Sequence, residues 1–185
     1  MLYLFVIIFG TLIVGIIDGL LFASHIFGGI VCATLTTISI FLIDGLLAFL
    51  IRRLPERWFS YGKRIFAVTK KERKIYRALK INAWKDYIPE LGGFTSFHKN
   101  ELKSVSDEKY LKRFILESNY GVVIHLANAI LGIFVVLLPY AHRISIWLPI
   151  FTVNFILSIL PFMILRYHLP VLERLCQRAS PKRDA

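Results

Sequence analysis

The residues best suited to chemistry in this sequence lie in one segment, ESNYGVVIHLANAILG, residues 117–132. On a helix, at about 100° per residue, five of its polar and small residues fall in one stripe about 80° wide. These residues are Glu117, Gly121, His125, Asn128 and Gly132. Such a stripe faces protein or water and not lipid, and a histidine in it could serve as a general base. The stripe is equally typical of a helix-packing face with a hydrogen-bonded histidine, and the segment alone leaves both interpretations open.

The elements that carry these residues are expected to be membrane helices. Hydrophobic residues make up 56% of the 185 residues, against about 45–50% in a typical soluble domain. Long apolar stretches suited to crossing a bilayer occupy residues 2–23, 29–51, 120–140 and 146–165. The sequence therefore predicts an all-α integral membrane protein with four transmembrane helices and a basic, partly helical segment between the second and third spans.

The distribution of charge predicts the organisation and the orientation of the chain. The formal net charge is +11, and Arg143 is the one basic residue outside the central segment and the C-terminal end. We expect a transmembrane hairpin at 1–51, a basic cytoplasmic or interfacial segment at 52–118, a second hairpin at 119–167 and a basic tail at 168–185. Because basic loops stay on the cytoplasmic side, the N-terminus, the central segment and the C-terminus are predicted to be cytoplasmic, in a multi-pass cell-membrane protein.

Local signals place helices and a loop in the central segment. The run Thr69-Lys70-Lys71-Glu72 has the pattern of a capping box, which predicts a helix from there to about Ala83. Residues 84–93 contain a proline and two glycines and are typical of a loop. Ser106-Asp107-Glu108 has the composition of a second helix start. No stop signal follows it, so we expect one helix over residues 107–133 that runs into the third span.

Three polar side chains fall at a similar predicted depth in three different spans. Counted from the cytoplasmic ends at 1.5 Å per residue, Asp44 lies roughly 10 Å, His125 roughly 8 Å and Ser158 roughly 10 Å inside. An ionisable residue at such a depth is a hypothesis for a functional site, and an aspartate beside a histidine would orient the imidazole and raise its basicity. In the alternative interpretation, Asp44 pairs with a basic side chain of the loop and only fixes helix packing.

The sequence lacks several common catalytic signatures: G-x-S-x-G, H-E-x-x-H, the P-loop, the dinucleotide fingerprint and the H-x-x-x-x-D acyltransferase motif. Its histidines have no metal-ligand spacing, and Cys32 and Cys176 form no disulfide framework. We therefore predict no metal and no cofactor. The basic residues of 52–118 are interleaved with aromatic residues typical of a membrane interface. The expected partners are a bilayer with anionic lipids and an anionic acyl carrier, and not nucleic acid.

Several short motifs follow one another along the second part of the chain. They are L-P-x-x-W-F from Leu54 to Phe59, Glu72 with Tyr76, W-K-D-x-I-P-E from Trp84 to Glu90, Gly93-Phe94, Glu117 with His125, and Arg166-Tyr167 with Pro170 and Leu172. Their order and spacing over about residues 54–175 resemble the glycosyl-diaponeurosporenoate acyltransferases of staphyloxanthin-type carotenoid biosynthesis. The residues around His125 and after Tyr167 depart from the family pattern. The resemblance therefore implies acyl transfer to a sugar or lipid hydroxyl without implying a carotenoid acceptor.

The resulting hypothesis is a membrane-bound acyltransferase. It moves a fatty acyl group from a thioester donor, acyl-CoA or an acyl carrier, to a hydroxyl of a glycolipid or other lipid at the cytoplasmic face. His125 is the general base, oriented by Asp44 or Glu117, and Lys85 or a loop N–H stabilises the oxyanion. The predicted catalytic residues are His125, Glu117, Asp44 and Asp86, and the predicted substrate-binding residues are Trp84, Lys85, Asn128, Ser158, Arg166 and Tyr167. For Trp84 and Lys85, an interfacial anchor and a positive-inside charge are competing interpretations.

A second class of function also fits the sequence. Paired Asp-Gly elements, Asp18-Gly19 and Asp44-Gly45, and the prolines of the fourth span are typical of broken helices around a midplane site. These features favour a non-catalytic carrier of a membrane lipid, such as a polyprenyl lipid, or the membrane subunit of a larger assembly. Four spans are few for a transporter, so this alternative goes with a homo-oligomer. An enzyme would need His125, whereas a carrier would depend more on Asp18 and Asp44.

Overall fold

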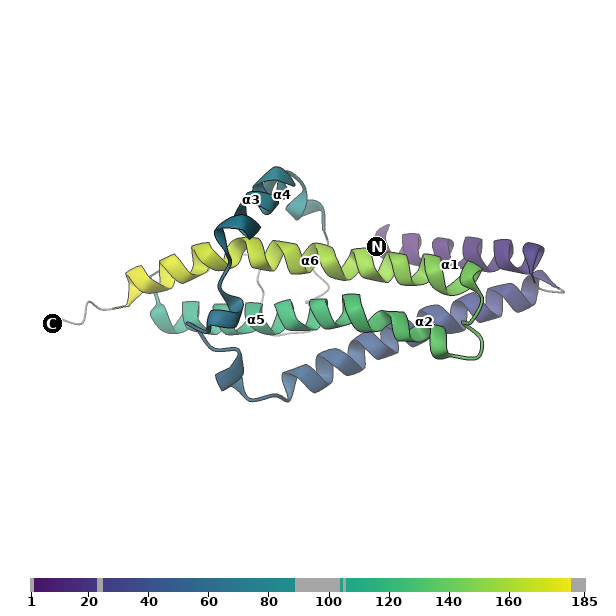
Figure 1. Cartoon of the computed structure of the whole chain (residues 1–185), viewed down its shortest axis with the longest axis horizontal. Helices are drawn as coiled ribbons and strands as arrows, with labels where there is room; N and C mark the ends of the chain where they lie inside the picture. Colours follow the sequence, from purple (N-terminus) through teal and green to yellow (C-terminus); the bar gives the residue numbers. More distant parts are fainter. Residues whose placement is uncertain (1, 23–24, 89–103, 105, 181–185) are drawn as a thin grey trace. The chain divides into compact units, whose positions relative to one another are not determined.

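The computed structural model of the chain describes residues 2–22, 25–88, 104 and 106–180, and its regular elements within these ranges are all helical, which confirms the all-α prediction (Figure 1). The α-helices are α1 Leu2–Leu21, α2 Ile26–Arg52, α3 Lys70–Ala78, α4 Ile81–Trp84, α5 Glu108–Leu131 and α6 Ile144–Ala179. Short 3₁₀ helices are η1 Glu56–Trp58, η2 Arg64–Phe66, η3 Lys85–Tyr87 and η5 Gly132–Leu137.

Three helical stretches are long and apolar enough to cross a membrane: Ile26–Arg52, Glu108–Leu137 and Ile144–Ala179. They correspond to the second, third and fourth predicted spans. The first predicted span corresponds to α1, whose stretch Phe5–Leu21 falls among the shorter apolar helices. Three helices therefore support the prediction of a membrane protein. The crossing of the bilayer by α1 stays a prediction.

The capping box before α3 forms as predicted, but the helix ends earlier than Ala83. The Glu72 N–H donates to the Thr69 hydroxyl at 3.1 Å, and the Thr69 N–H donates to the Glu72 carboxylate at 3.4 Å. After Ala78 the chain leaves the helix, because Lys80 adopts a left-handed conformation with a φ of +50° that an α-helix does not accommodate. In the predicted loop, residues 85–87 form η3, and Pro89, Glu90, Gly93 and Phe94 lie outside the described residues.

The helix α5 begins where the sequence predicts, and α6 extends beyond its prediction. The Asp107 carboxylate accepts hydrogen bonds from the N–H groups of Lys109 and Tyr110 at 2.9 and 3.1 Å, and so caps α5. At its other end, α5 tightens into η5 at Gly132 instead of continuing to Ile133. The fourth predicted span ends at 165, whereas α6 continues to Ala179. In the extension, buried side chains recur at helical spacing, namely Arg166, Leu169, Leu172 and Cys176. Their packing maintains the helix beyond the membrane-like stretch.

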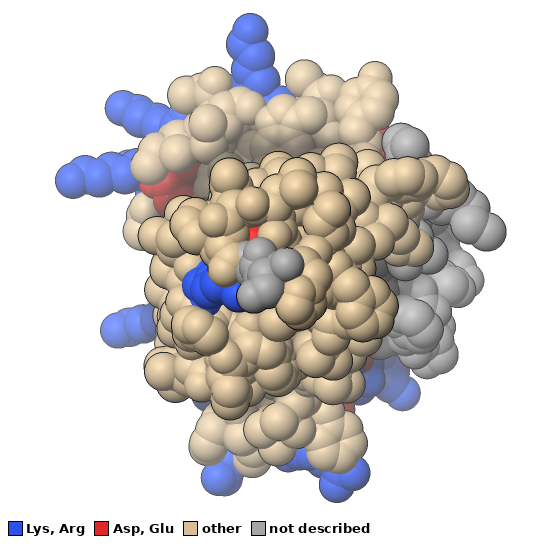
Figure 2. Space-filling view, turned by 90° about the vertical axis from the view of Figure 1, so that its right-hand side faces the viewer, with Lys and Arg blue, Asp and Glu red and all other residues tan. Residues whose placement is uncertain are grey.

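The chain divides into two compact units, and α5 and α6 contribute to both. The first unit comprises Met1–Leu50 and Leu126–Ile159, and the second comprises Ile51–His125 and Leu160–Ala185. The first unit contains few charged residues: Asp18, Asp44 and Arg143. Figure 2 views the molecule from a side on which uncharged residues cover most of the surface. The basic segment between the spans belongs to the second unit.

Small residues let α1 and α2 approach closely in the first unit. A Cβ added at Gly15 would lie 2.6 Å from the Cα of Ile30, and one added at Gly19 would lie 2.5 Å from the Cα of Ile26. By contrast, a Cβ added at Gly45 would meet nothing within 4 Å. The two Asp-Gly elements therefore have unlike surroundings. This close approach is the small-residue packing common between membrane helices.

The aspartates of the two Asp-Gly elements also differ in their partners. Asp18 is fully buried, pairs with Arg143 at 2.8 Å and accepts a hydrogen bond from the Ser145 hydroxyl. The ion pair and the hydrogen bond join Asp18 to the start of α6. Asp44 is half-buried and accepts a long hydrogen bond, 3.5 Å, from the Asn154 side chain.

Replacement of Gly29 by Ala should destabilise the first unit by about 1–3 kcal/mol, because it overpacks the contact between α1 and α2. A Cβ at Gly29 would clash with the carbonyl oxygen of Gly15 and would lie 2.8 Å from the Cα of Gly19. Gly45→Ala, in the same helix, is the matched control and should be neutral. The thermal midpoint of each variant in detergent measures the difference. Equal midpoints for the two variants would contradict the close packing.

Candidate active site

A buried arginine ties the second unit together. The Arg166 guanidinium on α6 donates to both carboxylate oxygens of Glu72 at 2.8 Å, through Nε and Nη2. It also donates to the carbonyl oxygens of Phe66 at 2.7 Å and Ala67 at 3.3 Å. A bidentate pair of this kind is strong and has a defined geometry. The contacts join α6 to the first turn of α3 and to the end of η2. They leave the guanidinium little capacity for a ligand.

Tyr76 completes this network from the next turn of α3. Its hydroxyl donates to Glu72 Oε1 at 2.6 Å, and its side chain is buried. Burial alone would raise the pKa of Glu72, but the hydrogen bonds from Arg166 and Tyr76 outweigh it and lower the pKa below its ordinary value. Burial and the bond to Glu72 raise the pKa of the Tyr76 phenol. Both groups therefore keep their protonation states near neutral pH, and the network positions other elements.

Acid should weaken this network, and the sign follows from the lowered pKa of Glu72. A carboxylate with a depressed pKa in the folded state contributes stability at neutral pH, and that stability is lost as the pH falls through its folded pKa, which lies below 4.5. The thermal midpoint of the wild-type protein should therefore fall more steeply below this pH than that of Glu72→Gln, which should be less stable at neutral pH. If the thermal midpoints of the two proteins fell in parallel with pH, Glu72 would not be the source of the acid sensitivity.

Glu117 is held by two arginines. Its carboxylate pairs with Arg52 at 3.1 Å and with Arg113 at 2.7 Å, and Arg113 also pairs with Glu56 at 3.0 Å. The Glu117 side chain is only 5% exposed. His125 lies eight residues later on α5, which is about 12 Å along the helix axis. This separation does not support the alternative in which Glu117 orients His125 directly. The arrangement favours a positioning role for Glu117.

The L-P-x-x-W-F segment is fastened to α5 beside Glu117. The Tyr120 hydroxyl donates to the Leu54 carbonyl oxygen at 2.8 Å, and the Asn119 amide donates to the Phe59 carbonyl oxygen at 2.8 Å. The rings of Phe59 and Tyr120 stack with centroids 4.0 Å apart. The two polar side chains come from adjacent residues of α5 and satisfy backbone groups of a segment that forms only a short 3₁₀ turn. Neither residue was singled out by the sequence.

The predicted site residues divide between the units. His125 is half-buried at the end of the α5 stretch in the second unit. Asp44, Asn128 and Ser158 belong to the first unit, where Asn128 and Ser158 are buried. Asp44 contacts Asn154, a residue the sequence analysis did not select. The pairing of His125 with Asp44 stays a prediction.

The W-K-D segment forms a tight turn after α4. The Trp84 indole N–H donates to the Leu79 carbonyl oxygen at 2.9 Å, so the ring closes the turn between α3 and η3. Lys85 pairs with Asp86 at 3.5 Å, and Asp86 remains 82% exposed. The charges of both act on His168, which follows Tyr167 on α6. The ring of Tyr167 meets that of His168 edge to face, with centroids 5.3 Å apart.

His168 is thus a second half-buried histidine in the second unit, and it is not among the site residues that the sequence predicts. Its position two residues after Arg166 is a signal that the motif at 166–172 could have provided. Among the described residues, no cluster of His, Cys, Asp and Glu side chains is arranged to hold a metal ion.

A basic cleft of about 510 Å³ lies between η1 and the first turns of α5 in the second unit. Its lining combines basic side chains with two hydroxyls: Glu56, Arg57, Ser60, Tyr61, Lys109, Lys112, Arg113 and Leu116. Lys112 pairs with Glu108, and Arg113 pairs with Glu56 and Glu117. Within the described part of the chain, Arg57 and Lys109 have no acidic partner. The cleft therefore has positive charge available for an anionic group.

A family model described as glycosyl-4,4'-diaponeurosporenoate acyltransferase (CrtO) matches residues 55–178, about two thirds of the chain. The chain belongs to the CrtO acyltransferase family. The match includes the network of Glu72, Tyr76 and Arg166 as well as Glu117, and it omits α1 and α2. No curated protein and no solved structure matches the chain. Membership of the CrtO family supports a membrane acyltransferase, and so an enzyme.

Proposed function

We propose that this protein transfers a fatty acyl group from a thioester donor to a hydroxyl group of a glycolipid or another lipid acceptor. The observation that carries the proposal is the CrtO family match over residues 55–178. The family name is that of an acyltransferase acting on a glycosylated carotenoid acid, which makes a carotenoid glycoside one candidate acceptor. The apolar helices place the reaction at a membrane. The positive-inside distribution of Lys and Arg supports a reaction at the cytoplasmic face, with both termini on that side.

The basic cleft is the proposed site for the phosphate-bearing carrier of the donor. Acyl-CoA and acyl carriers are anionic, and a guanidinium or ammonium group binds a phosphate by charge-assisted hydrogen bonds. Arg57 and Lys109 line the cleft without acidic partners among the described residues. Arg166, one of the predicted substrate-binding residues, donates its hydrogen bonds to Glu72 and to two carbonyl groups. We therefore assign carrier binding to the cleft and a positioning role to Arg166.

His125 is the proposed general base. Its imidazole takes the proton of the acceptor hydroxyl while the hydroxyl oxygen attacks the thioester carbonyl. The tetrahedral intermediate then expels the thiolate, which receives the proton from the imidazolium and leaves as a thiol. Lys85 or a nearby backbone N–H stabilises the oxyanion. Trp84 and Tyr167 are the proposed substrate-binding residues of the second unit, and Asp86 is a further proposed catalytic residue there.

An acyl-transfer assay with purified protein tests the proposal. The wild type, in vesicles containing anionic lipid and host lipid extract, should form a new acylated lipid from a labelled long-chain acyl-CoA, and the product mass identifies the acceptor. The double variant Arg57→Glu/Lys109→Glu should raise KM for acyl-CoA about tenfold or more, with kcat little changed. Lys63→Glu, an exposed charge reversal outside the cleft lining, is the matched control.

Two outcomes would count against the proposal. A folded wild type that forms no product with acyl-CoA or acyl-carrier donors would refute acyl transfer itself. Equal KM values for the cleft variant and for Lys63→Glu would refute donor binding in the cleft. They would not refute acyl transfer.

A further inference from the structure

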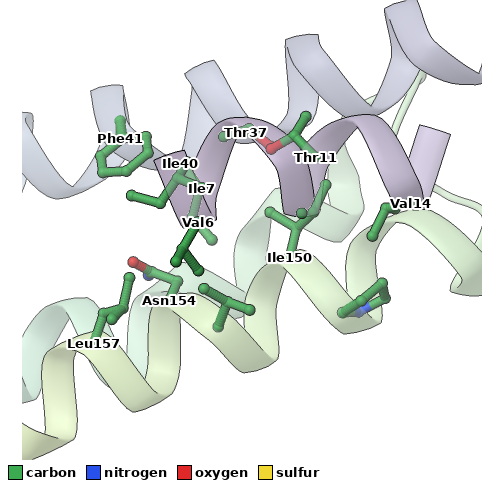
Figure 3. Close-up of a pocket in the computed structure, with 13 residues that line it drawn as sticks. Val6, Ile7, Thr11, Val14, Thr37, Ile40, Phe41, Ile150, Asn154 and Leu157 are labelled. Carbon is green, nitrogen blue, oxygen red and sulfur yellow. The ribbon is translucent and has the colours of Figure 1, made fainter. Parts of the chain in front are cut away.

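The first unit contains an apolar cavity of about 150 Å³ between α1, α2 and α6 (Figure 3). Gly10 and Val14 line it from α1, Ile40 and Phe41 from α2, and Ile150 and Asn154 from α6. All of these residues belong to the first unit, so the cavity is separate from the basic cleft and from the buried network of the second unit. None of the motifs of the family contributes to it.

The polar side chains of the lining are engaged with other protein groups. The hydroxyls of Thr11 and Thr37 lie 3.0 Å apart and form a hydrogen bond. The Asn154 amide donates to Asp44. A buried water requires about two to four polar partners, and an apolar cavity without them stays dry. The cavity is therefore suited to hydrocarbon, because an empty space would lose dispersion contacts on all of its walls.

The mouth of the cavity opens onto an apolar surface. Among its lining residues, Val6 is 61% exposed, Val153 45% and Phe41 43%. These side chains lie on helices whose composition suits them to the membrane interior, so hydrocarbon chains have access to the opening. An apolar cavity of about 150 Å³ in another protein, an example in general use, binds benzene. The space in the first unit therefore fits the terminal part of one alkyl chain.

We propose that this cavity binds the alkyl tail of the acyl group that the protein transfers, and so limits its length. The identity of the chain as the transferred acyl group rests on the proposed function, whereas the binding of an alkyl chain does not. The depth of the cavity then selects among acyl donors by the number of methylene groups they carry. A hydrophobic pocket discriminates about tenfold or more for each methylene group that no longer fits.

Gly10 offers a direct way to fill the cavity. Gly10 is exposed and lines the cavity, and a Cβ added there meets nothing within 4 Å, so there is open space for a larger side chain at the cavity wall. Gly10→Leu places an isobutyl group in the space, and Gly10→Ala is a milder step. Gly45→Leu is the matched control, because Gly45 also has open space around it, is exposed and lies outside the lining.

The experiment measures binding and product length in the same full-length proteins. A palmitoyl probe with a terminal diazirine is photo-crosslinked in vesicles, and the acyl chains of the products formed from a mixture of acyl-CoA lengths are weighed by mass spectrometry. Gly10→Leu should reduce labelling about tenfold or more and shift the products to shorter chains. Gly10→Ala should shift them less, and Gly45→Leu should match the wild type.

Undiminished labelling of Gly10→Leu would overturn the binding site. Lost labelling with an unchanged product distribution would overturn the assignment to the transferred chain and identify a resident membrane lipid as the occupant. If the wild type forms no product, the proposed function fails, and the labelling difference between Gly10→Leu and Gly45→Leu alone then decides whether the cavity binds an alkyl chain.

Discussion

Replacement of His125 by Ala should reduce acyl transfer about 10²–10⁴-fold while the protein remains folded in the membrane. The expected loss is that of a general base, since a lipid hydroxyl is a weak nucleophile until its proton is taken up. His125 is half-buried on α5, within the second unit that the CrtO family match covers. The measurement is the turnover of labelled acyl-CoA at matched protein level, together with the thermal midpoint of each variant.

Two other histidines serve as controls for this prediction. His168→Ala removes the half-buried imidazole beside Lys85 and Asp86, and His142→Ala removes an exposed one next to α6. His142→Ala should leave turnover unchanged. Full activity of His125→Ala would refute the assignment. If His168→Ala were the inactive variant, the general base would lie on α6 instead of α5.

Replacement of Arg166 by Leu should destabilise the protein by about 3–5 kcal/mol. The change leaves the Glu72 carboxylate without its bidentate partner and the carbonyl oxygens of Phe66 and Ala67 without donors. Arg166→Lys should recover only part of the loss, because an ammonium group lacks the planar fork of the guanidinium. Thermal unfolding and limited proteolysis of the segment around α3 measure these effects in detergent.

A double-mutant cycle measures the interaction free energy between Glu72 and Arg166 apart from the effect of each single substitution. Glu72→Leu/Arg166→Leu should be less destabilised than the sum of the single variants, because neither buried charge is then left alone. Additive effects would show that the two residues act independently. If Arg166→Leu were as stable as the wild type and only its KM for acyl-CoA were raised, the result would support the predicted substrate-binding role of Arg166.

The local features of this protein were predictable from the sequence. The length and apolar composition of the spans predict membrane helices, because each peptide group in a bilayer must be hydrogen-bonded within its own segment. The capping box at Thr69 and the acidic cap at Asp107 predict two helix starts, since each depends on contacts over about three residues. The order of the motifs was also sufficient to indicate the acyltransferase family.

The partners of the charged residues were decided only by tertiary structure. Arg166 pairs with Glu72 across 94 residues of sequence, and the chain contains many other acids and bases that could form such a pair by composition alone. The same holds for the ion pair of Asp18 with Arg143. The choice depends on which helix faces meet, and side-chain periodicity within one helix carries no information about its neighbour.

Tertiary packing also decided where helices end. The left-handed Lys80 stops α3 before Ala83, and buried side chains continue α6 through Arg166 to Ala179. The extension of α6 changes the interpretation of the site, because Arg166 lies beyond the predicted end of the fourth span at 165 but is a buried residue of a long helix in the structure. Helix propensity is a weak preference, and the burial of side chains against other elements outweighs it.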